Sequence, residues 1–290
     1  MRLTATTSPI ENLAGLDNAV RLIAEGGYDC LDLTLTGMEK PDNAWMGPGM
    51  AEHVRELCAQ YGICTGQTHA PFKFRWSDPV DYEKLCIPNI IRSIEIAGML
   101  GARVIVVHPL HHLSYREYGR MEFDQSLDLY RTLLPYAHRW NVKIATENMY
   151  QFDEQGHTIP DMLADAYEAV RMIDTIADDF FTMCVDVGHA GLGRLYTAGQ
   201  MIRILGHDRV GALHIHDNDN IWDSHHVPYQ GVLDWDDICG VLREIRYEGD
   251  FCMEVLDKVY YRHYTDQAML LKAIAFAADT GRHLISKIER

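Results

Sequence analysis

The 290-residue chain lacks several features that would place it in whole classes of protein. It has no run of about 18 apolar residues, the length that a membrane-spanning helix needs. Its opening residues, MRLTATTSPI, are too polar for a secretory signal peptide. No segment rich in Ser, Gly or Pro divides it, so residues 1–290 are expected to form a single domain. None of the seven cysteines, Cys30 and Cys64 among them, forms a C-x-x-C pair. We expect them to be reduced core residues of a cytoplasmic protein.

Basic residues are also scarce. The chain has 26 Lys and Arg against 42 Asp and Glu, a formal net charge of −16. A protein this acidic repels phosphate backbones unless a local basic patch compensates. The nearest candidate for such a patch is FKFRWS at residues 72–77, which is better explained as a lid or as ordinary packing. Neither nucleic acid nor a membrane is therefore an expected partner.

What the chain does contain is a repeated pattern of short apolar runs. Such runs, rich in Val, Ile, Leu, Cys and Thr, suit parallel strands that are covered on both faces. The expected strands are residues 3–7, 30–36, 63–69, 103–108, 142–147, 181–186, 210–216 and 250–256. Segments with helical spacing lie between them, including residues 88–100, 126–140, 162–176 and 266–285. Asp234 is placed to cap the helix of WDDICGVLREIR.

Eight strand-then-helix units in a chain of this length predict an α/β fold of the (β/α)8 TIM-barrel type. An open, doubly wound sheet is the alternative architecture. That fold needs a glycine-rich phosphate loop after its first strand, where this chain has Ser8, Pro9 and Ile10. The barrel is therefore favoured.

Residues able to bind a metal stand at the ends of six successive expected strands. They are His69, His108, Glu147, Asp186, His216 and Glu254, with His189 three residues after Asp186. Because side chains alternate along a strand, several of these polar residues continue an otherwise apolar inward face, as His108 does after Val104 and Val106. Carboxylates and imidazoles that converge on one buried axis need compensation, which a divalent cation can provide. In a barrel this end of the strands holds the active site.

Two loops carry further expectations. In DSHHVPYQGVLDW, residues 223–235, Asp223 and His225 stand two apart, so both can reach one site. His111 and His112 follow Pro109 in the loop after the fourth strand, and we expect them to be exposed to solvent or part of a lid.

The segments THAP, VVHP, TEN, VDVGHA, HIHDND, DSHHVPYQGVLDW and MEVL, in this order, resemble the xylose isomerase-like superfamily of TIM barrels. The resemblance is to its sugar-phosphate isomerase and epimerase branch, which is related to endonuclease IV. It implies a metal held by Glu147, Asp186, His216 and Glu254. It selects His216 rather than His214, which lies one inward layer lower and is expected to pack or to support the ligands from behind.

The resemblance also implies roles for the remaining polar residues. Endonuclease IV binds three zinc ions with additional ligands, and those positions match His69, His108, His189, Asp223 and His225. In isomerase-like members such histidines contact substrate instead, so His189, His225 and His108 are candidates for that role. The segment VPYQGVLDW resembles a pattern, L-x-P-G-x-G-x-I-D-W, whose first glycine is Tyr229 here. The local turn and any phosphate-holding role for it stay open.

The expected function is that of a divalent-metal-dependent sugar or sugar-phosphate isomerase or epimerase. A metal-stabilised enediolate would form, with Glu147 and Glu254 as the acid and base. Three carboxylates and one imidazole favour one Mn²⁺, with Mg²⁺, Co²⁺ or Zn²⁺ as alternatives. Two other functions stay open: a trinuclear-zinc phosphodiesterase similar to endonuclease IV, and a lyase or dehydratase acting on a sugar-like or cyclitol substrate. Association into a homo-oligomer also stays open.

Overall fold

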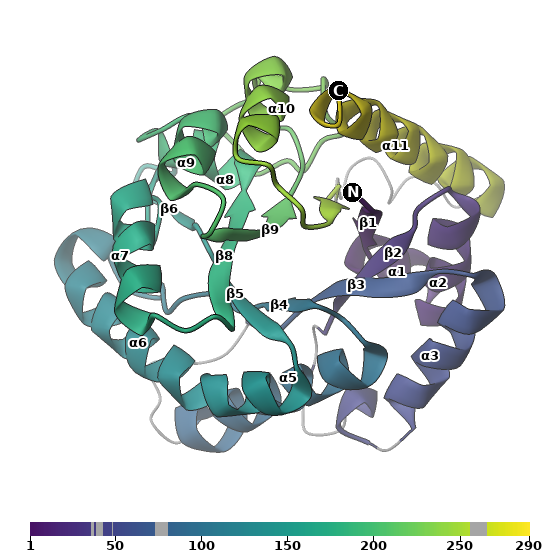
Figure 1. The fold of residues 1–290 in the computed structure, drawn as a ribbon, viewed down its shortest axis with the longest axis horizontal. Helices are drawn as coiled ribbons and strands as arrows, with labels where there is room; N and C mark the ends of the chain where they lie inside the picture. Colours follow the sequence, from purple (N-terminus) through teal and green to yellow (C-terminus); the bar gives the residue numbers. More distant parts are fainter. Residues whose placement is uncertain (36–37, 39–42, 48, 73–80, 256–265) are drawn as a thin grey trace.

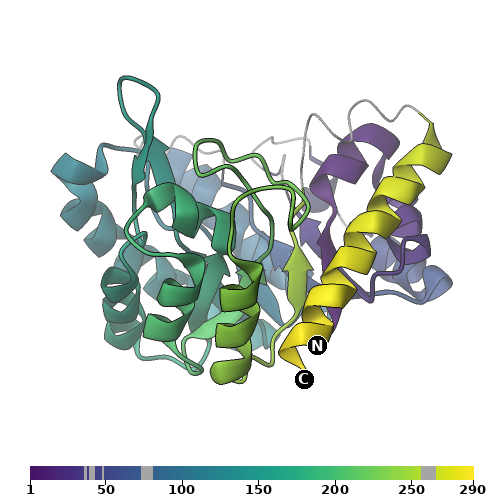
Figure 2. The same ribbon diagram turned by 90° about the horizontal axis from the view of Figure 1, so that it is seen from above.

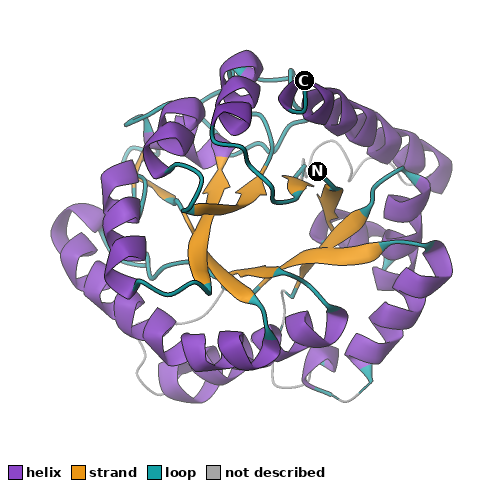
Figure 3. Cartoon of the chain, viewed as in Figure 1, coloured by secondary structure: helices purple, strands orange, loops and turns teal. Residues whose placement is uncertain are grey.

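A computed structural model describes residues 1–35, 38, 43–47, 49–72, 81–255 and 266–290. Eight parallel strands form one sheet in the order β10-β1-β2-β3-β4-β5-β8-β9, which curls into a barrel (Figures 1 and 3). The strands are β1 (Leu3–Thr6), β2 (Cys30–Thr34), β3 (Cys64–His69), β4 (Val104–Val106), β5 (Lys143–Glu147), β8 (Phe181–Asp186), β9 (Val210–His214) and β10 (Phe251–Met253). The prediction of a (β/α)8 barrel is confirmed.

The barrel closes between the two ends of this sheet. Just beyond β9, the amide of Ile215 donates to the carbonyl of Cys252 at 2.8 Å. The amide of Glu254 donates in return to the carbonyl of Ile215 at 3.0 Å. This pair of bonds joins the last strand to the strand before it and fixes Glu254 at the rim.

Helices form a ring outside the strands (Figure 1). They are α1 (Ser8–Ala14), α2 (Leu16–Glu25), α3 (Met50–Tyr61), α5 (Ile87–Leu100), α6 (Tyr115–Trp140), α7 (Ala166–Ile176), α8 (Val187–Gly193), α9 (Ala198–Leu205), α10 (Trp235–Glu244) and α11 (Gln267–Ile288). Asp234 caps α10 by accepting from the amides of Asp236 and Asp237, as its position before the helix predicts. Among the described residues, no helix is long and apolar enough to cross a bilayer.

Alternation along the strands divides the apolar residues between two cores. The larger core lies between the strands and the helices. The smaller core fills the inside of the barrel with the short side chains Val104, Val106, Ala145, Cys184 and Ala212. Inward side chains recur every second residue along a strand. The polar residues at the strand ends therefore lie in the layer above these short side chains.

Two features differ from expectation or were not foreseen. Cys30 and Cys64 form a disulfide, which corrects the expectation that all cysteines are reduced. They are register partners at the start of β2 and β3, so the parallel pairing brings them together. A hairpin of β6 (Tyr150–Phe152) and β7 (Thr158–Pro160) follows β5 and projects beyond the barrel, teal in Figure 2. Residues 36, 73–77 and 256 of the segments expected from the sequence lie outside the described residues.

Candidate active site and metal centre

Three predicted carboxylates meet at one end of the barrel. Glu147 and Asp186 are the last residues of β5 and β8, and Glu254 follows β10 directly. Together with His214 they form a group in which one ligand atom from each side chain lies within 4.8 Å of the others. His214 Nδ1 lies 3.1 Å from Glu254 Oε2 and 3.3 Å from Glu147 Oε1. The described residues thus bring together a set of oxygen and nitrogen donors suited to a divalent cation.

The imidazole grouped with the three carboxylates is His214, whereas the sequence predicted His216. His214 is the register partner of Asp186, so the two residues lie in the same layer at the end of their strands. His216 lies higher, with Nε2 3.0 Å from both carboxylate oxygens of Asp186. Because a strand repeats every two residues, alternation gives both histidines the same face and cannot choose between them. Which imidazole binds a metal stays a prediction, and the geometry favours His214.

The residues matched to additional metal positions lie beside this group in two clusters. His216 belongs to a cluster with His189, Asp223 and His225. In that cluster Asp223 Oδ2 lies 2.7 Å from His225 Nε2 and 3.7 Å from His189 Nε2. The second cluster is His69, His108 and Glu147, so Glu147 belongs to both this cluster and the carboxylate group.

Backbone carbonyls orient three of these imidazoles in the same manner. Nδ1 of His69 bonds to the carbonyl of Ala70 at 2.7 Å. Nδ1 of His189 and of His225 bond in the same way to Asn148 and Glu254, at 2.9 Å and 2.8 Å. A neutral imidazole that donates from Nδ1 to a carbonyl has Nε2 free to accept, whereas Nε2 of His225 faces the carboxylate of Asp223 and must donate to it. The rings are therefore set before any ligand arrives.

Asp186 has a second task at the start of α8. Its side chain accepts the amide of His189 at 2.7 Å and so caps the helix. This bond explains the spacing of three residues between the two side chains. Between them stands Gly188, where an added Cβ would lie 2.0 Å from Cε1 of His216. Only glycine leaves space for that ring.

Asp32 supports the group from behind, and sequence reasoning missed it. It is completely buried on β2, and its Oδ2 lies 3.7 Å from Nε2 of His214. The same oxygen, Oδ2, also accepts from Cys252 Sγ at 3.6 Å. The available signal was an aspartate in the middle of the apolar strand CLDLT.

The two glutamates differ in their electrostatic surroundings. Burial on its own would raise the pKa of Glu147, but the neighbouring His214 and His108 hold that pKa well below its usual range. At Glu254 burial dominates and the pKa is raised. Burial also lowers the pKa of His108 to about 3, so this imidazole is neutral at neutral pH.

In the cluster that contains Asp223, two histidines hold their protons tightly. Burial disfavours the charged form of His225, but the carboxylate of Asp223 outweighs burial and raises the pKa to about 9. The pKa of His189 is likewise raised well above its usual value, against burial, by Asp186 and Asp223. Protonated imidazoles thus balance the buried carboxylates, and a bound cation could take over that role.

Unpaired buried atoms test whether a cation suits the group. Glu147 Oε2 and His214 Nδ1 are inaccessible to solvent and make no hydrogen bond. Asp223 Oδ1 is a third such atom, in the cluster with His189, His216 and His225. Buried polar atoms without partners are costly, and these three belong to side chains of the candidate metal groups. The donors present therefore fit a divalent cation.

A cavity of about 350 Å³ opens above these groups. Its polar lining includes both glutamates and every histidine of the two clusters except His216. Its apolar lining includes Phe72, Tyr150 and Phe152. Phe72 stacks on His108 with ring centroids 4.7 Å apart. Phe152 reaches from the hairpin to Trp222, 5.8 Å away. The cavity thus combines hydrogen-bonding groups with aromatic faces, a mixture that suits polyhydroxylated ligands.

The loop of residues 223–235 keeps its turn without the expected glycine. Tyr229 stands where the resembling pattern has glycine, and it adopts the left-handed conformation with φ of 73°. Its amide donates to Asp217 Oδ2 at 2.9 Å, and Trp235 Nε1 donates to the same oxygen at 2.8 Å. The buried carboxylate of Asp217 therefore organises the turn despite the strain at Tyr229.

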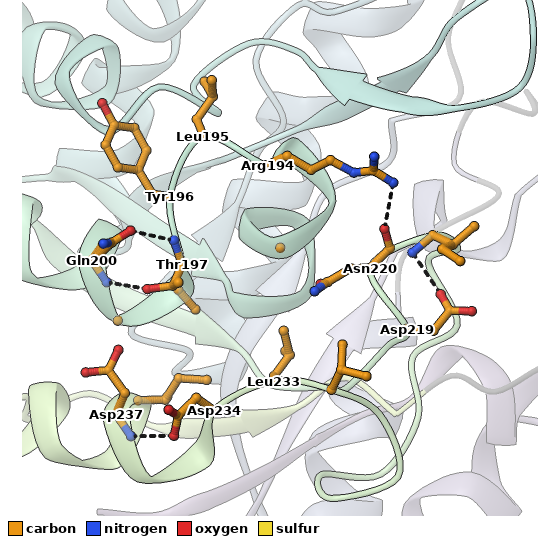
Figure 4. Close-up of a pocket in the computed structure, with 16 residues that line it drawn as sticks. Arg194, Leu195, Tyr196, Thr197, Gln200, Asp219, Asn220, Leu233, Asp234 and Asp237 are labelled. Carbon is orange, nitrogen blue, oxygen red and sulfur yellow. Dashed lines mark hydrogen bonds between the residues drawn. The ribbon is translucent and has the colours of Figure 1, made fainter.

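A second cavity, of about 640 Å³, lies outside the barrel mouth between α9 and the loop before α10 (Figure 4). Its polar groups mostly bond to one another. Thr197 and Gln200 form a capping box, and Arg194 Nη2 donates to the carbonyl of Asn220 at 3.1 Å. Since these groups serve local structure, the barrel mouth is the stronger candidate for catalysis.

Fold and site together define a parallel barrel with a metal-capable mouth, and comparison with known proteins agrees. The model of the family of xylose isomerase-like TIM barrels matches residues 20–279, and the chain belongs to this family. An uncharacterized protein of Methanocaldococcus jannaschii, MJ1311, is 26% identical over 247 residues, covering 82% of this chain and 78% of that protein. The uncharacterized protein ML2432 of Mycobacterium leprae is 25% identical and covers 94% of each chain.

Solved structures similar to this chain share its fold. The IolI protein with a bound zinc atom has a TM-score of 0.78 at 19% identity, covering 99% of each chain. D-psicose 3-epimerase, solved in the presence of D-fructose, has a TM-score of 0.75 at 16% identity, covering 98% of this chain and 99% of that one. A D-tagatose 3-epimerase-like protein has a TM-score of 0.73 at 21% identity, covering 96% and 98%.

Proposed function

We propose that this protein is a divalent-metal-dependent isomerase or epimerase of sugars or sugar phosphates. The observation that carries the proposal is the pair of glutamates, Glu147 and Glu254, that faces one cavity on either side of His214. The strands that bear them, β5 and β10, are separated in the barrel by β8 and β9. Two carboxylates placed in this way can address opposite faces of one substrate carbon. The epimerases among the structures with this fold support a sugar as the substrate.

Glu147, Asp186, His214 and Glu254 would hold the cation. A set of three carboxylates and one imidazole favours Mn²⁺, with Mg²⁺, Co²⁺ or Zn²⁺ as alternatives. The zinc atom in IolI shows that a protein of this fold can bind a divalent metal. When bound, the cation would supply a Lewis acid for the carbonyl and the adjacent hydroxyl of the substrate.

The side chains of the protein would move and position the reacting groups. One glutamate removes the proton from the carbon beside the carbonyl, and the other returns a proton to the opposite face. That sequence inverts the carbon, whereas return of the proton to the neighbouring carbon exchanges aldose and ketose. His189, His225 and His108 line the same cavity and would bond to substrate hydroxyls. Phe72 and Tyr150 would pack against the C–H faces of the sugar.

The test is proton exchange with solvent. Purified Mn²⁺-loaded protein is incubated in D₂O with free and phosphorylated ketoses, and the products are followed by NMR. The proposal predicts deuterium at one carbon next to the carbonyl and an unchanged set of carbon and oxygen atoms. Loss of water from the substrate would instead identify the dehydratase alternative. No exchange with any ketose, at any of the four metals named above, would overturn the proposal.

The additional metal-capable residues around the carboxylate group favour a second candidate, a trinuclear-zinc phosphodiesterase. The two clusters add His69, His108, His189, His216, Asp223 and His225 to the ligand atoms of the carboxylate group. Against this candidate stands the net charge of −16, because a nucleic acid requires several cationic contacts. Metal analysis by mass spectrometry separates the two functions. About three zinc ions per chain, with cleavage of abasic DNA, would favour the phosphodiesterase, and one ion would favour the isomerase.

A cytoplasmic location is part of the same proposal, and assembly into a homo-oligomer stays open. Cell fractionation tests the first, and light scattering after gel filtration tests the second.

A further inference from the structure

A histidine and a buried carboxylate form a pair at the edge of the active-site cavity. His111, in the loop after β4, has Nδ1 at 3.2 Å from Oδ2 of Asp161. Asp161, which follows β7, is fully buried, while the side chain of His111 is 27% exposed. His111 is one of the residues that line the cavity above the metal-capable groups. His111 is therefore partly buried and faces the cavity.

We propose that His111 is a specificity residue that binds a substrate hydroxyl away from the reacting carbon, and that Asp161 is the residue that positions it. This inference rests on the proposed function, because it concerns a sugar bound in the same cavity. With Nδ1 donating to Asp161, Nε2 is the ring nitrogen that a ligand in the cavity can meet. The buried carboxylate fixes both the ring orientation and the tautomer, so Nε2 accepts a hydrogen bond from a hydroxyl.

The position of His111 sets which part of a substrate it can reach. Its ring centroid lies 5.7 Å from that of His108, and His108 Nε2 lies 3.3 Å from Oε2 of Glu147. Among the described residues the ion pair of His111 is with Asp161 and not with Glu147, so His111 lies farther from Glu147 than His108 does. A sugar whose reacting carbon lies between Glu147 and Glu254 would extend a later hydroxyl of its chain toward His111.

The chemistry of the pair suits a neutral hydroxyl better than a phosphate. A protonated His111 would still face the carboxylate of Asp161, so the pair carries no net positive charge. Phosphate binding draws on cationic side chains or on several backbone amides. We therefore assign this end of the cavity to the polyol portion of a ketose.

The neighbouring histidine shows what a purely structural pair looks like. Glu122 accepts the backbone amides of His112 and Leu113, both at 2.9 Å, and its carboxylate lies 3.3 Å from His112 Nδ1. These bonds hold the loop itself, and His112 is not among the residues that line the active-site cavity. His112 is consequently a matched control for His111, one residue away and also paired with a buried carboxylate.

The first experiment uses His111→Asn, His112→Asn and Asp161→Asn in the Mn²⁺-loaded protein. Asparagine at position 111 can keep the bond to Asp161 and lacks Nε2. With D-fructose, D-allulose or D-tagatose, whichever the wild type converts, KM should rise roughly three- to tenfold, the value of one lost hydrogen bond. The kcat should change much less, and His112→Asn should match the wild type.

The increase in KM should disappear with one deoxy analogue of that ketose, the one lacking the hydroxyl that meets His111. An unchanged KM, or an equal penalty with every deoxy analogue, would overturn the assignment.

The variant Asp161→Asn tests the positioning role separately. Its amide can donate to Nδ1, which moves the imidazole proton to Nε2 and turns the acceptor into a donor. We expect KM to rise without loss of the fold, as judged by circular dichroism and melting temperature. A KM equal to that of the wild type, with the fold intact, would remove Asp161 from the proposal.

The second experiment does not depend on turnover. Metal-loaded wild-type protein is treated with diethylpyrocarbonate, with and without saturating D-fructose, and modified histidines are located by peptide mass spectrometry. Protection of His111 but not of His112 supports the inference even if no ketose is converted, in which case only the proposed reaction fails. Turnover without protection and with an unchanged KM overturns the inference alone. If the protein shows neither turnover nor protection, both the inference and the proposed function are overturned.

Discussion

His214 faces Glu254 where the barrel closes, with Nδ1 3.1 Å from Oε2. The contact joins β9 to the residue that follows β10, on the two strands whose pairing completes the barrel. Behind it, Asp32 approaches the opposite ring nitrogen at 3.7 Å. The geometry of the candidate metal group is thus tied to closure of the barrel itself.

The two histidines of β9 and its extension should differ in their effect on metal binding. We expect His214→Asn to weaken Mn²⁺ binding by well over the 10–100-fold that loss of a supporting residue costs. His216→Asn should weaken the first Mn²⁺ by tenfold or less, because His216 contacts only Asp186 in the carboxylate group. Isothermal titration of metal-free protein measures both affinities. The opposite order would return the ligand role to His216.

Replacement of either glutamate should stop catalysis while leaving the fold intact. Glu147→Gln and Glu254→Gln each remove an acid or base, and we expect kcat to fall roughly 10²–10⁴-fold. Activity on the identified ketose and circular dichroism are measured together, with exposed Glu56→Gln on α3 as the control. Full activity in both variants would reject the scheme with two glutamates.

Asp32 should affect metal affinity without contacting the metal. Asp32→Asn keeps the shape of the side chain but removes the negative charge behind His214. We expect Mn²⁺ affinity to fall roughly 10–100-fold, as for other residues that orient a ligand. The melting temperature measured in EDTA separates this effect from a loss of stability. If affinity stays at the wild-type value, Asp32 is only part of the packing.

Acid should destabilise the protein partly through Asp29. Its carboxylate is half-buried, which opposes ionisation, but two bonds from Arg282 at 2.7 Å and one from the amide of Leu3 at 2.7 Å lower its pKa. A carboxylate whose pKa is lowered by folding stabilises the fold at pH values above its pKa in the unfolded chain, which is near 4. This stabilisation is lost as the pH falls through the pKa of the folded protein. Because the pair is partly exposed, Asp29→Asn should cost only on the order of 1 kcal/mol at pH 7.

Chemical denaturation of wild type and Asp29→Asn at several pH values measures this difference. The gap between the two proteins should close as pH falls below 4. A gap that stays constant from pH 7 to pH 3 would show that the charge of Asp29 does not matter.

The sequence was enough to predict the barrel and much of its mouth. Apolar runs located the strands, and the end of each run placed Glu147, Asp186 and Glu254 on a common rim, where the structure has them. These predictions rest on the local pattern of apolar residues, on alternation along a strand and on the parallel arrangement of the strands. All three can be recognised in the sequence alone.

The remaining features depend on contacts that no local pattern encodes. The choice between His214 and His216 needs the register of β9 against β8, since both have the same parity. The pairing of His111 with Asp161 joins residues 50 positions apart, and the disulfide of Cys30 and Cys64 joins residues 34 apart. Each follows only once the strands are placed beside one another.

The most direct test of the account is to locate the cation. Anomalous diffraction at the manganese edge, from a crystal of the protein soaked in MnCl₂, gives the position of the ion without any assumption about activity. The account predicts a strong peak within coordination distance of Glu147, Asp186, His214 and Glu254. A peak that lies elsewhere, or the absence of a peak at saturating Mn²⁺, would contradict it.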